Sequence, residues 1–287
     1  MKVRKAVIPA AGMGTRFLPV TKAVPKELLP LVDRAAMQYV VEEAAAAGIE
    51  EVIVVTARGK EALADYFDKH AELESLLAAR GDNDRLAQVR RTSELVQMEY
   101  VRQPEQLGLG HAVACAARVV GSEPFAVILP DDIIAAEPGA LTQLLEVFER
   151  YGSSVIAVEE VDGPAIQSYG VIDPEPVSDG VYRVRGTVEK PALADAPSNL
   201  GIVGRYVLTP QIFDALAEVK EGAIGELQLT DGLAILLKDQ DIYALRFQGT
   251  RYDVGNPMGL LRASVEMALR REDTGPAFEE FLRRLLA

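Results

Sequence analysis

Four residues with small or absent side chains follow an apolar run near the start of the chain: Ala10, Ala11, Gly12 and Gly14. A loop of this kind lets backbone N–H groups approach an anion closely. Three cations come next: Arg16, Lys22 and Lys26. The loop and the cations together predict a site for several phosphate charges, although the glycines alone would favour a plain turn between a strand and a helix with a solvated basic patch behind it.

The loop differs from two common phosphate-binding motifs. Gly12-Met13-Gly14 is followed by Thr15-Arg16-Phe17 without a third glycine, so it is not a dinucleotide-binding fingerprint. No Gly-Lys-Ser/Thr follows, so it is not a P-loop either. The combination Gly-x-Gly-Thr-Arg with Pro25-Lys26-Glu27 eleven residues later is far more specific than two glycines.

Two carboxylates suit a hard cation. Asp131 comes directly after an apolar strand and is a reasonable ligand for Mg²⁺, which needs only one or two carboxylates beside water and phosphate. Asp253 is the best candidate for a second donor. The alternative role for an aspartate at a strand end is to cap a helix, and Asp132 could take that role.

A second charged pair lies later in the chain. Glu189 could accept a hydrogen bond from a sugar hydroxyl, and Lys190 provides a point charge suited to a phosphate monoester. The alternative is an exposed ion pair on an edge strand, which contributes little to stability.

The remaining reactive side chains predict no chemistry. His70 and His111 lack partners nearby in the sequence, so a surface or structural histidine is expected at both positions. Cys115 is the only cysteine, which excludes a disulfide within the chain and a cysteine-based zinc cluster. It is expected to be a small buried residue on a helix.

The composition narrows the class of protein. The 287 residues carry a net charge of −13, which argues against a nucleic-acid partner and requires any phosphate site to be built from local cations or a metal. No apolar run approaches the roughly 18 residues of a membrane span. The apolar run after residue 5 is cut short by Pro9 and Gly12, so it does not form a signal peptide. A soluble cytoplasmic protein is expected.

The elements that must position these residues alternate in the first half of the chain. Apolar runs predict strands, and helical spacing of apolar residues predicts helices between them. The expected strands cover residues 3–8, 51–56, 96–101, 125–129 and 153–158, and helices cover 36–47, 111–119 and 139–150. This alternation predicts a mainly parallel sheet flanked by helices, with ligands at the carboxyl ends of the strands. Residues 71–95 are expected to form a polar excursion from the sheet.

The pattern changes after about residue 160. Residues 169–172 and 181–184 flank a turn and predict a hairpin, and further strands are expected at 201–208 and 241–247 around a helical segment, 210–238. Two helices end the chain, with an apolar side that packs on the body or on another subunit. We therefore expect a single domain with a first half (1–160), a second half (161–256) and C-terminal helices (257–287).

The motifs together resemble the signature of the sugar-1-phosphate nucleotidylyltransferases, and within that family they are most similar to the bacterial members that act on UTP and glucose 1-phosphate. The matching stretches follow the family's order and cover nearly the whole chain: residues 12–19, 21–22, 25–27, 103–104, 108–112, 129–132, 168–171, 188–191, 199–206, 226–231 and 252–255. One departure is Pro257 after the Asp253 motif, which is acceptable as the first residue of a helix.

The resemblance implies a Rossmann-like, GT-A-like nucleotidyltransferase fold with a nucleotide-binding half and a sugar-binding hairpin region. It implies that the loop of Ala10, Ala11, Gly12 and Gly14 contacts the nucleotide, and that base recognition is completed by Gln103 and Gly108. It assigns the triphosphate to Arg16 and Lys26, with Glu27 holding Lys26. It assigns Mg²⁺ to Asp131 and Asp253, and glucose 1-phosphate to Gly170, Glu189 and Lys190.

The implied reaction is the transfer of UMP from UTP to glucose 1-phosphate, giving UDP-glucose and pyrophosphate in a homodimer or homotetramer. Two alternatives remain open. One is a sister enzyme that uses dTTP, ATP, CTP or another sugar phosphate, and the other is a non-catalytic nucleotide-sensing subunit on the same fold.

Overall fold

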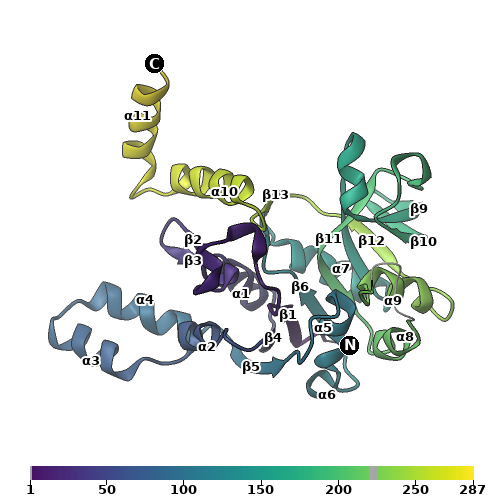
Figure 1. Ribbon diagram of the computed structural model, residues 1–287, viewed down its shortest axis with the longest axis horizontal. Coiled ribbons are helices and arrows are strands. Elements are labelled where there is room, and N and C mark those ends of the chain that lie inside the picture. Colours follow the sequence, from purple (N-terminus) through teal and green to yellow (C-terminus); the bar gives the residue numbers. More distant parts are fainter. Residues whose placement is uncertain (1, 220–224) are drawn as a thin grey trace.

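A nine-stranded sheet runs through the computed structural model, which describes residues 2–219 and 225–287 (Figure 1). The strand order is β5-β4-β1-β6-β11-β8-β12-β10-β9. The strands are β1 (Lys5–Pro9), β4 (Glu51–Thr56), β5 (Gln97–Arg102), β6 (Phe125–Ile128), β8 (Val155–Glu160), β9 (Gly170–Ser178), β10 (Val181–Glu189), β11 (Leu200–Leu208) and β12 (Tyr243–Arg246). Strands β5, β4, β1 and β6 pair in parallel, whereas β11 is antiparallel to β6 and β8. The mixed sheet confirms the predicted fold class.

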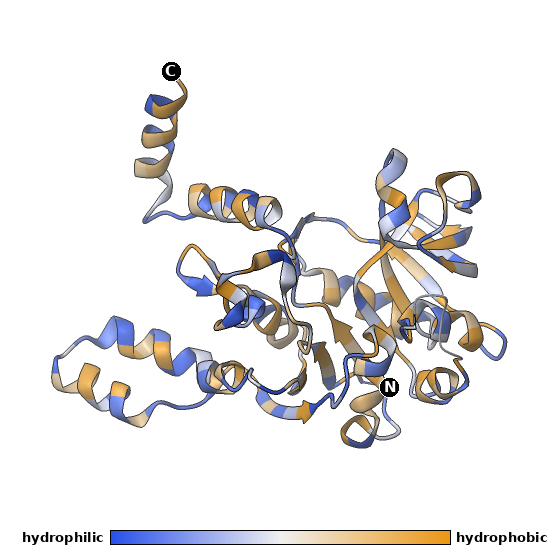
Figure 2. Ribbon diagram, in the orientation of Figure 1, coloured by the Kyte–Doolittle hydropathy of each residue, from blue (hydrophilic) through white to orange (hydrophobic). Residues whose placement is uncertain are grey.

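Helices cover both faces of this sheet. Those of the described residues are α1 (Ala36–Ala46), α2 (Ala62–Phe67), α3 (Ala71–Ala79), α4 (Asn83–Ser93), α5 (Leu109–Cys115), α6 (Ala117–Val120), α7 (Ala140–Tyr151), α8 (Ile212–Glu218), α9 (Leu229–Leu236), α10 (Pro257–Arg270) and α11 (Gly275–Leu286). In Figure 2 the central strands are mostly hydrophobic, whereas the helices carry hydrophobic and hydrophilic residues side by side. None of these helices combines the length and apolar character that crossing a membrane requires.

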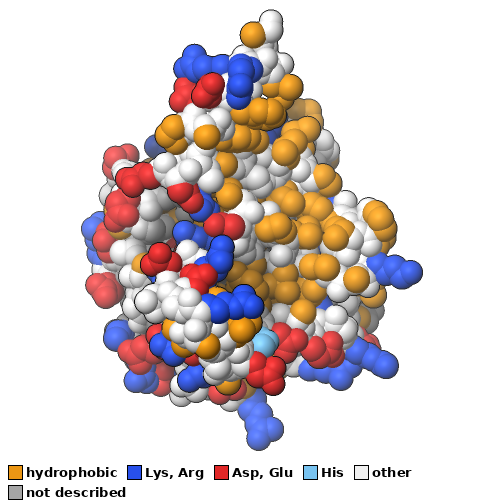
Figure 3. Space-filling model, turned by 90° about the vertical axis from the view of Figure 1, so that its left-hand side faces the viewer, with side chains coloured by type: hydrophobic (Ala, Val, Ile, Leu, Met, Phe, Trp, Pro, Cys, Tyr) orange, Lys and Arg blue, Asp and Glu red, His pale blue; other side chains and the backbone are white. Residues whose placement is uncertain are grey.

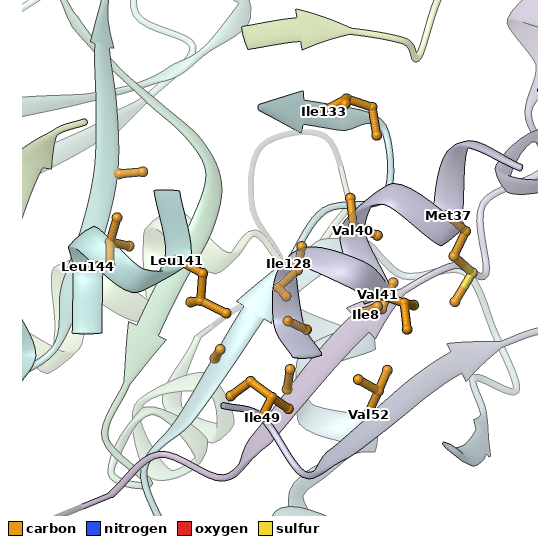
Figure 4. Close-up of a cluster of buried hydrophobic side chains, with 14 of the residues drawn as sticks. Ile8, Met37, Val40, Val41, Ile49, Val52, Ile128, Ile133, Leu141 and Leu144 are labelled. Carbon is orange, nitrogen blue, oxygen red and sulfur yellow. The ribbon is translucent and has the colours of Figure 1, made fainter. Parts of the chain in front are cut away.

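Strand β1 is buried on both faces, as its sequence predicts. Ile8 belongs to the same hydrophobic cluster as Val41 of α1 and Leu144 of α7 (Figure 4). Val7 points the other way, because successive side chains of a strand alternate between faces, and joins a cluster with α5, α8 and α9. The carboxyl end of β1 is therefore held rigidly at the edge where ligands bind in open α/β sheets.

Two predicted segments differ from the structure in detail. Residues 71–95 do leave the sheet, but they form the helices α3 and α4, which lie against each other and in which Leu77 and Leu86 are buried. The Asp82 side chain caps α4 by accepting a hydrogen bond from Arg85 N at 3.3 Å. The helical segment expected at 210–238 consists of α8 and α9, while its residues 220–224 lie outside the described residues.

The second half of the sheet curls back on itself. The expected hairpin is formed by β9 and β10, and Val171 of β9 also pairs with Gly201 of β11. Two short ribbons were not expected from the sequence: β2 (Pro30–Leu31) pairs with β3 (Arg34–Ala35), and β7 (Asp132–Ala135) pairs with β13 (Thr250–Asp253). The second ribbon places Asp253 opposite Asp132, so it brings together two segments that lie more than 100 residues apart.

Candidate active site

Two cavities open beside the carboxyl ends of β1 and β6, and Asp131 lines both of them. The first cavity is bordered by the loop after β1 and by the segment after β5, including Gly12, Lys26, Gln103 and Gly108. The second is bordered by Arg16, Gly170, Glu189 and Asp253, among others. Asp131 therefore stands at the boundary between residues expected to contact a nucleotide and residues expected to contact a sugar phosphate.

The loop after β1 is folded tightly onto the segment that follows it. Ala10 N donates to Val55 O at 2.8 Å, which continues the β1–β4 ladder. Gly14 has a φ of 66°, and a Cβ there would lie 3.1 Å from the Cβ of Lys26 and from the Cγ2 of Thr21. Thr21 Oγ1 donates to Gly14 O at 2.8 Å. Glycine at position 14 thus allows Lys26 to lie directly beside the loop.

Lys26 forms an ion pair with Asp131, whose Oδ2 lies 2.6 Å from Lys26 Nζ. Burial lowers the pKa of Lys26, but the Asp131 carboxylate outweighs it and the net pKa lies above the ordinary value. Burial likewise raises the pKa of Asp131, but Lys26 and the local hydrogen bonds more than offset that effect, so the net pKa is lowered. Both groups are therefore charged at neutral pH.

The structure corrects the expected role of Glu27 as the group that holds Lys26. Its buried carboxylate accepts from Lys60 Nζ at 2.9 and 3.0 Å, while Lys26 bonds to Asp131. Lys60 Nζ also donates to Ala10 O at 2.6 Å. Burial is the main cause of a raised pKa at Glu27 and a lowered pKa at Lys60. This buried pair fastens the loop after β1 to the segment after β4.

The opposite wall of the first cavity is formed by the segment after β5. Gly108 has a φ of 104°, and a Cβ there would lie 2.7 Å from Leu227 O, so this position requires glycine. Gln106 Nε2 donates to Ala11 O at 2.8 Å, which joins the two walls. His111 Nδ1 lies 2.9 Å from Nε2 of Gln103, which agrees with the structural histidine that was one of the two expectations for this position.

The two predicted metal carboxylates lie beside the same small space. A Cβ built on Gly255 would be 2.9 Å from Asp131 Oδ2 and 3.0 Å from Asp253 Oδ1. Two carboxylates suit Mg²⁺, which completes its octahedron with water and phosphate, so the residues fit this ion. Among residues 2–219 and 225–287, no group of three or more His, Cys, Asp or Glu is arranged to hold a metal.

Asp132 does not cap a helix, contrary to the alternative suggested by its sequence position. It begins β7, and its Oδ2 accepts from Gly204 N at 2.7 Å. Its Oδ1 accepts from Arg251 Nε at 2.7 Å. Pro257, in contrast, is the first residue of α10 as expected, and Asn256 caps that helix while its Nδ2 donates to Asp253 Oδ2 at 3.0 Å.

The second cavity has Gly170 and Glu189 in its wall. A Cβ on Gly170 would lie 2.7 Å from Thr230 Oγ1 and 3.1 Å from Glu189 Oε2, so glycine leaves room for both side chains. Lys190 adopts a φ of 46°, and its Nζ lies 3.4 Å from Glu189 Oε1. A lysine in the left-handed region is uncommon and marks a position constrained by its surroundings.

Comparison with known proteins places this geometry in a family. Residues 5–269 match the family described as nucleotidyl transferase. The chain belongs to the nucleotidyl transferase family. It is 50% identical over 284 residues to "UTP--glucose-1-phosphate uridylyltransferase 2" of Staphylococcus saprophyticus, an alignment that covers 99% of this chain and 98% of the relative. It is 49% identical to "UTP--glucose-1-phosphate uridylyltransferase" of Staphylococcus epidermidis, over 99% of both chains.

Solved structures of the family have the same fold. A UTP-bound UGPase from Acinetobacter baumannii matches with a TM-score of 0.92 at 40% identity and covers 99% of this chain and 100% of its own. A UDP-glucose pyrophosphorylase complexed with UDP-glucose matches with a TM-score of 0.86 at 43% identity, over 94% of this chain and 100% of its own.

Three residues that sequence reasoning missed connect the parts of this nucleotidyl transferase site. Lys60 and Gln106 bond to the carbonyls of the loop after β1. Arg251 of β13 lies between Asp132, Glu159 and the hydroxyl of Tyr169, which it contacts at 3.1 Å. Each of these residues is isolated in the sequence from the motif it supports, so no local spacing pointed to it.

Proposed function

We propose that this nucleotidyl transferase transfers UMP from UTP to glucose 1-phosphate and releases pyrophosphate. One observation carries the proposal: two cavities meet at Asp131, so two phosphate-bearing substrates could bind on either side of one carboxylate. The relatives named as UTP–glucose-1-phosphate uridylyltransferases, which align with nearly the full chain, support the choice of substrates.

In this proposal the nucleotide occupies the first cavity. The loop of Ala10, Ala11, Gly12 and Gly14 gives the base and ribose a close backbone approach, and Gln103 and Gly108 face the base. Lys26 lines the same cavity, where its ammonium is held by Asp131 and can contact the phosphates. Glu27 acts indirectly, since its pairing with Lys60 supports the loop.

Glucose 1-phosphate occupies the second cavity in this proposal. Glu189 accepts a hydrogen bond from a sugar hydroxyl, and Gly170 leaves space for the ring. Lys190 contacts the phosphate monoester. Arg16 lines this cavity and reaches toward Gly255 O at 3.5 Å, so its guanidinium lies where the charges of both substrates would meet.

The reaction is an in-line displacement. An oxygen of the sugar phosphate attacks the α-phosphorus of UTP, the bond to the bridging oxygen breaks, and pyrophosphate leaves. Because a phosphate monoester is already anionic at neutral pH, no general base is needed, and the protein must hold two mutually repelling anions in line. Lys26, Arg16 and Lys190 oppose that repulsion. Asp131 and Asp253 would hold Mg²⁺, which when bound supplies further positive charge beside the phosphates.

The proposal is tested by measuring pyrophosphate release with UTP, dTTP, ATP and CTP, each combined with glucose 1-phosphate. We expect UTP to give the highest kcat/KM. A preference for another nucleotide would identify a sister enzyme of the family. No release with any pair, under conditions where nucleotide binding is detected, would support a nucleotide-sensing subunit instead.

We also propose that α10 and α11 contact a second copy of the chain, in a homodimer or homotetramer. Helix α11 projects away from the sheet (Figure 1) and leaves Leu285 and Leu286 66% and 83% exposed. On the face shown in Figure 3, hydrophobic side chains extend from the top, where α11 lies, toward the middle. Contiguous exposed apolar surface of this kind commonly marks a contact with another protein.

The expected cytoplasmic location stays a prediction, which cell fractionation would test.

A further inference from the structure

The orientation of the Gln103 side-chain amide is decided by two neighbours. Gln103 follows β5, where its backbone N donates to Thr56 O at 2.8 Å, and only 5% of the residue is exposed. Its Nε2 donates to Gly108 O at 3.3 Å. A backbone carbonyl can only accept, so the amide nitrogen and not the amide oxygen must face Gly108.

His111 receives the second hydrogen of the same amide nitrogen. Its Nδ1 lies 2.9 Å from Gln103 Nε2, and because that nitrogen is a donor, Nδ1 must be the unprotonated acceptor of the ring. The proton of the neutral ring then sits on Nε2, which lies 3.9 Å from the sulfur of Cys115, a weak acceptor. His111 and Cys115 are four residues apart on α5 and therefore share one face of that helix.

Both hydrogens of the Gln103 amide are thus taken up by acceptors of the protein itself, Gly108 O and His111 Nδ1. Within the described part of the chain, Oε1 of Gln103 accepts no hydrogen bond. This oxygen is also not one of the fully buried side-chain atoms that lack a hydrogen-bond partner. Among the described residues this oxygen is therefore not fully enclosed, and Gln103 lines the first cavity. An amide oxygen accepts hydrogen bonds only, so this wall of the cavity presents an acceptor to the base.

We propose that His111 is a positioning residue that holds Gln103 as a hydrogen-bond acceptor and thereby selects a pyrimidine whose N3 carries a proton. Uracil has this N3–H donor, whereas N3 of cytosine is an acceptor and would face the Gln103 oxygen without a hydrogen. If the amide turned over, Oε1 would face the Gly108 carbonyl, and two acceptors would oppose each other. This inference rests on the proposed function, because it assumes that the base of the nucleotide binds in the first cavity.

The inference is tested first on the unaltered protein, with 3-methyluridine triphosphate as the probe. The methyl group removes the N3 proton and leaves the rest of UTP unchanged. A site that accepts a hydrogen bond from its substrate discriminates strongly against an analogue that lacks the donor, so we expect kcat/KM to fall by about 100-fold or more for the methylated nucleotide and for CTP. Turnover of 3-methyluridine triphosphate close to that of UTP would overturn the inference.

The role of His111 is then tested with His111→Phe and His111→Leu, which remove the acceptor. We expect the preference for UTP over CTP to fall by about 10-fold, with a raised KM for UTP and an unchanged KM for glucose 1-phosphate. His111→Asn should restore the preference, because its Oδ1 can accept in place of Nδ1. Cys115→Ala is the matched control on the other side of the ring, and its preference should equal that of the unaltered protein.

The possible outcomes separate the two proposals. If the unaltered protein releases no pyrophosphate from UTP, the proposed function fails. If it uses UTP and rejects 3-methyluridine triphosphate, but folded His111→Phe and His111→Leu keep the full preference over CTP, only the positioning role of His111 fails. An equal loss toward both substrates in these variants would indicate a general structural role and would also overturn it.

Discussion

Asp131 is the side chain on which the proposed chemistry converges. It lines both cavities, pairs with Lys26 and faces the space beside Gly255 where Asp253 also points. Its lowered pKa keeps it ionised, as a metal ligand must be. A side chain with these contacts has a role that no neighbouring residue can replace, since Asp132 is committed to Gly204 and Arg251.

We therefore predict that Asp131→Asn lowers kcat by about 100- to 1,000-fold at saturating Mg²⁺, because the neutral amide no longer holds the cation and the Lys26 ammonium in place even when Mg²⁺ fills the site. Steady-state assays across a Mg²⁺ titration would measure this loss. The exposed Asp179 provides a control, and Asp179→Asn should leave kcat unchanged. Ordinary turnover by Asp131→Asn would rule out the metal assignment.

A substitution at Lys190 should affect the binding of glucose 1-phosphate but not that of UTP. We predict that Lys190→Ala raises the KM for glucose 1-phosphate by about 10-fold or more, since it removes a charged contact to the phosphate, and leaves the KM for UTP within about 2-fold. Initial rates with each substrate varied in turn would show the difference, with Lys238→Ala as an exposed-lysine control. Equal increases for both substrates would contradict the proposed role.

At the scale of elements, the site depends on segments that hold one another. The loop after β1 is fastened to the segment after β4 by Lys60 and to the segment after β5 by Gln106. The β7–β13 ribbon joins the segment that follows β6 to β13, the last strand of the second half. These contacts join parts that the strand order places at one edge of the sheet, so the position of the loop depends on the segments after β4 and β5.

Substitutions in the buried Lys60–Glu27 pair test whether Lys60 supports the loop after β1. Lys60→Met leaves the Glu27 carboxylate buried without its partner, so we predict a loss of about 3–5 kcal/mol in unfolding free energy and a raised KM for UTP. Urea unfolding and initial rates would measure the two effects, with Lys69→Met as an exposed control. Adding Glu27→Leu should recover stability but not the KM, because the Ala10 carbonyl still lacks its donor. Recovery of both would show that Lys60 does not support the loop.

At the scale of the whole molecule, the sheet forms the body and the C-terminal helices extend from it. Helix α11 has Phe278, Phe281 and Leu285 on one side, and Arg283 pairs with Glu279 within the helix at 2.6 Å. A helix with one apolar side is stabilised chiefly when that side is covered. The apolar residues that α11 exposes are therefore where the proposed second copy would pack.

We predict that Phe281→Asp combined with Leu285→Asp converts the oligomer into monomers while the body keeps its thermal stability, because the changes lie outside the sheet. Light scattering during size-exclusion chromatography would measure the mass. Arg284→Asp places an aspartate on the charged side of the same helix and should keep the oligomer intact. A monomeric unaltered protein, or variants with an unchanged mass, would contradict the proposal.

The sequence by itself determined the features that depend on neighbouring residues. The apolar run before Ala10, the glycines of the loop, the carboxylate that follows β6 and the hairpin of β9 and β10 could all be predicted, because strand, turn and helix preferences act over a few residues. The order of these motifs was also enough to indicate the family, and the full-length relatives confirm it.

The tertiary structure alone decided which side chains meet. Glu27 pairs with Lys60 and not with Lys26, Gln103 meets His111, and Asp132 turns toward Arg251 instead of capping a helix. Hydrogen bonds and ion pairs act over about 3 Å, and which groups come that close depends on strand order, register and the path of loops between distant elements. Those are properties of the whole chain, so no local spacing could have revealed them.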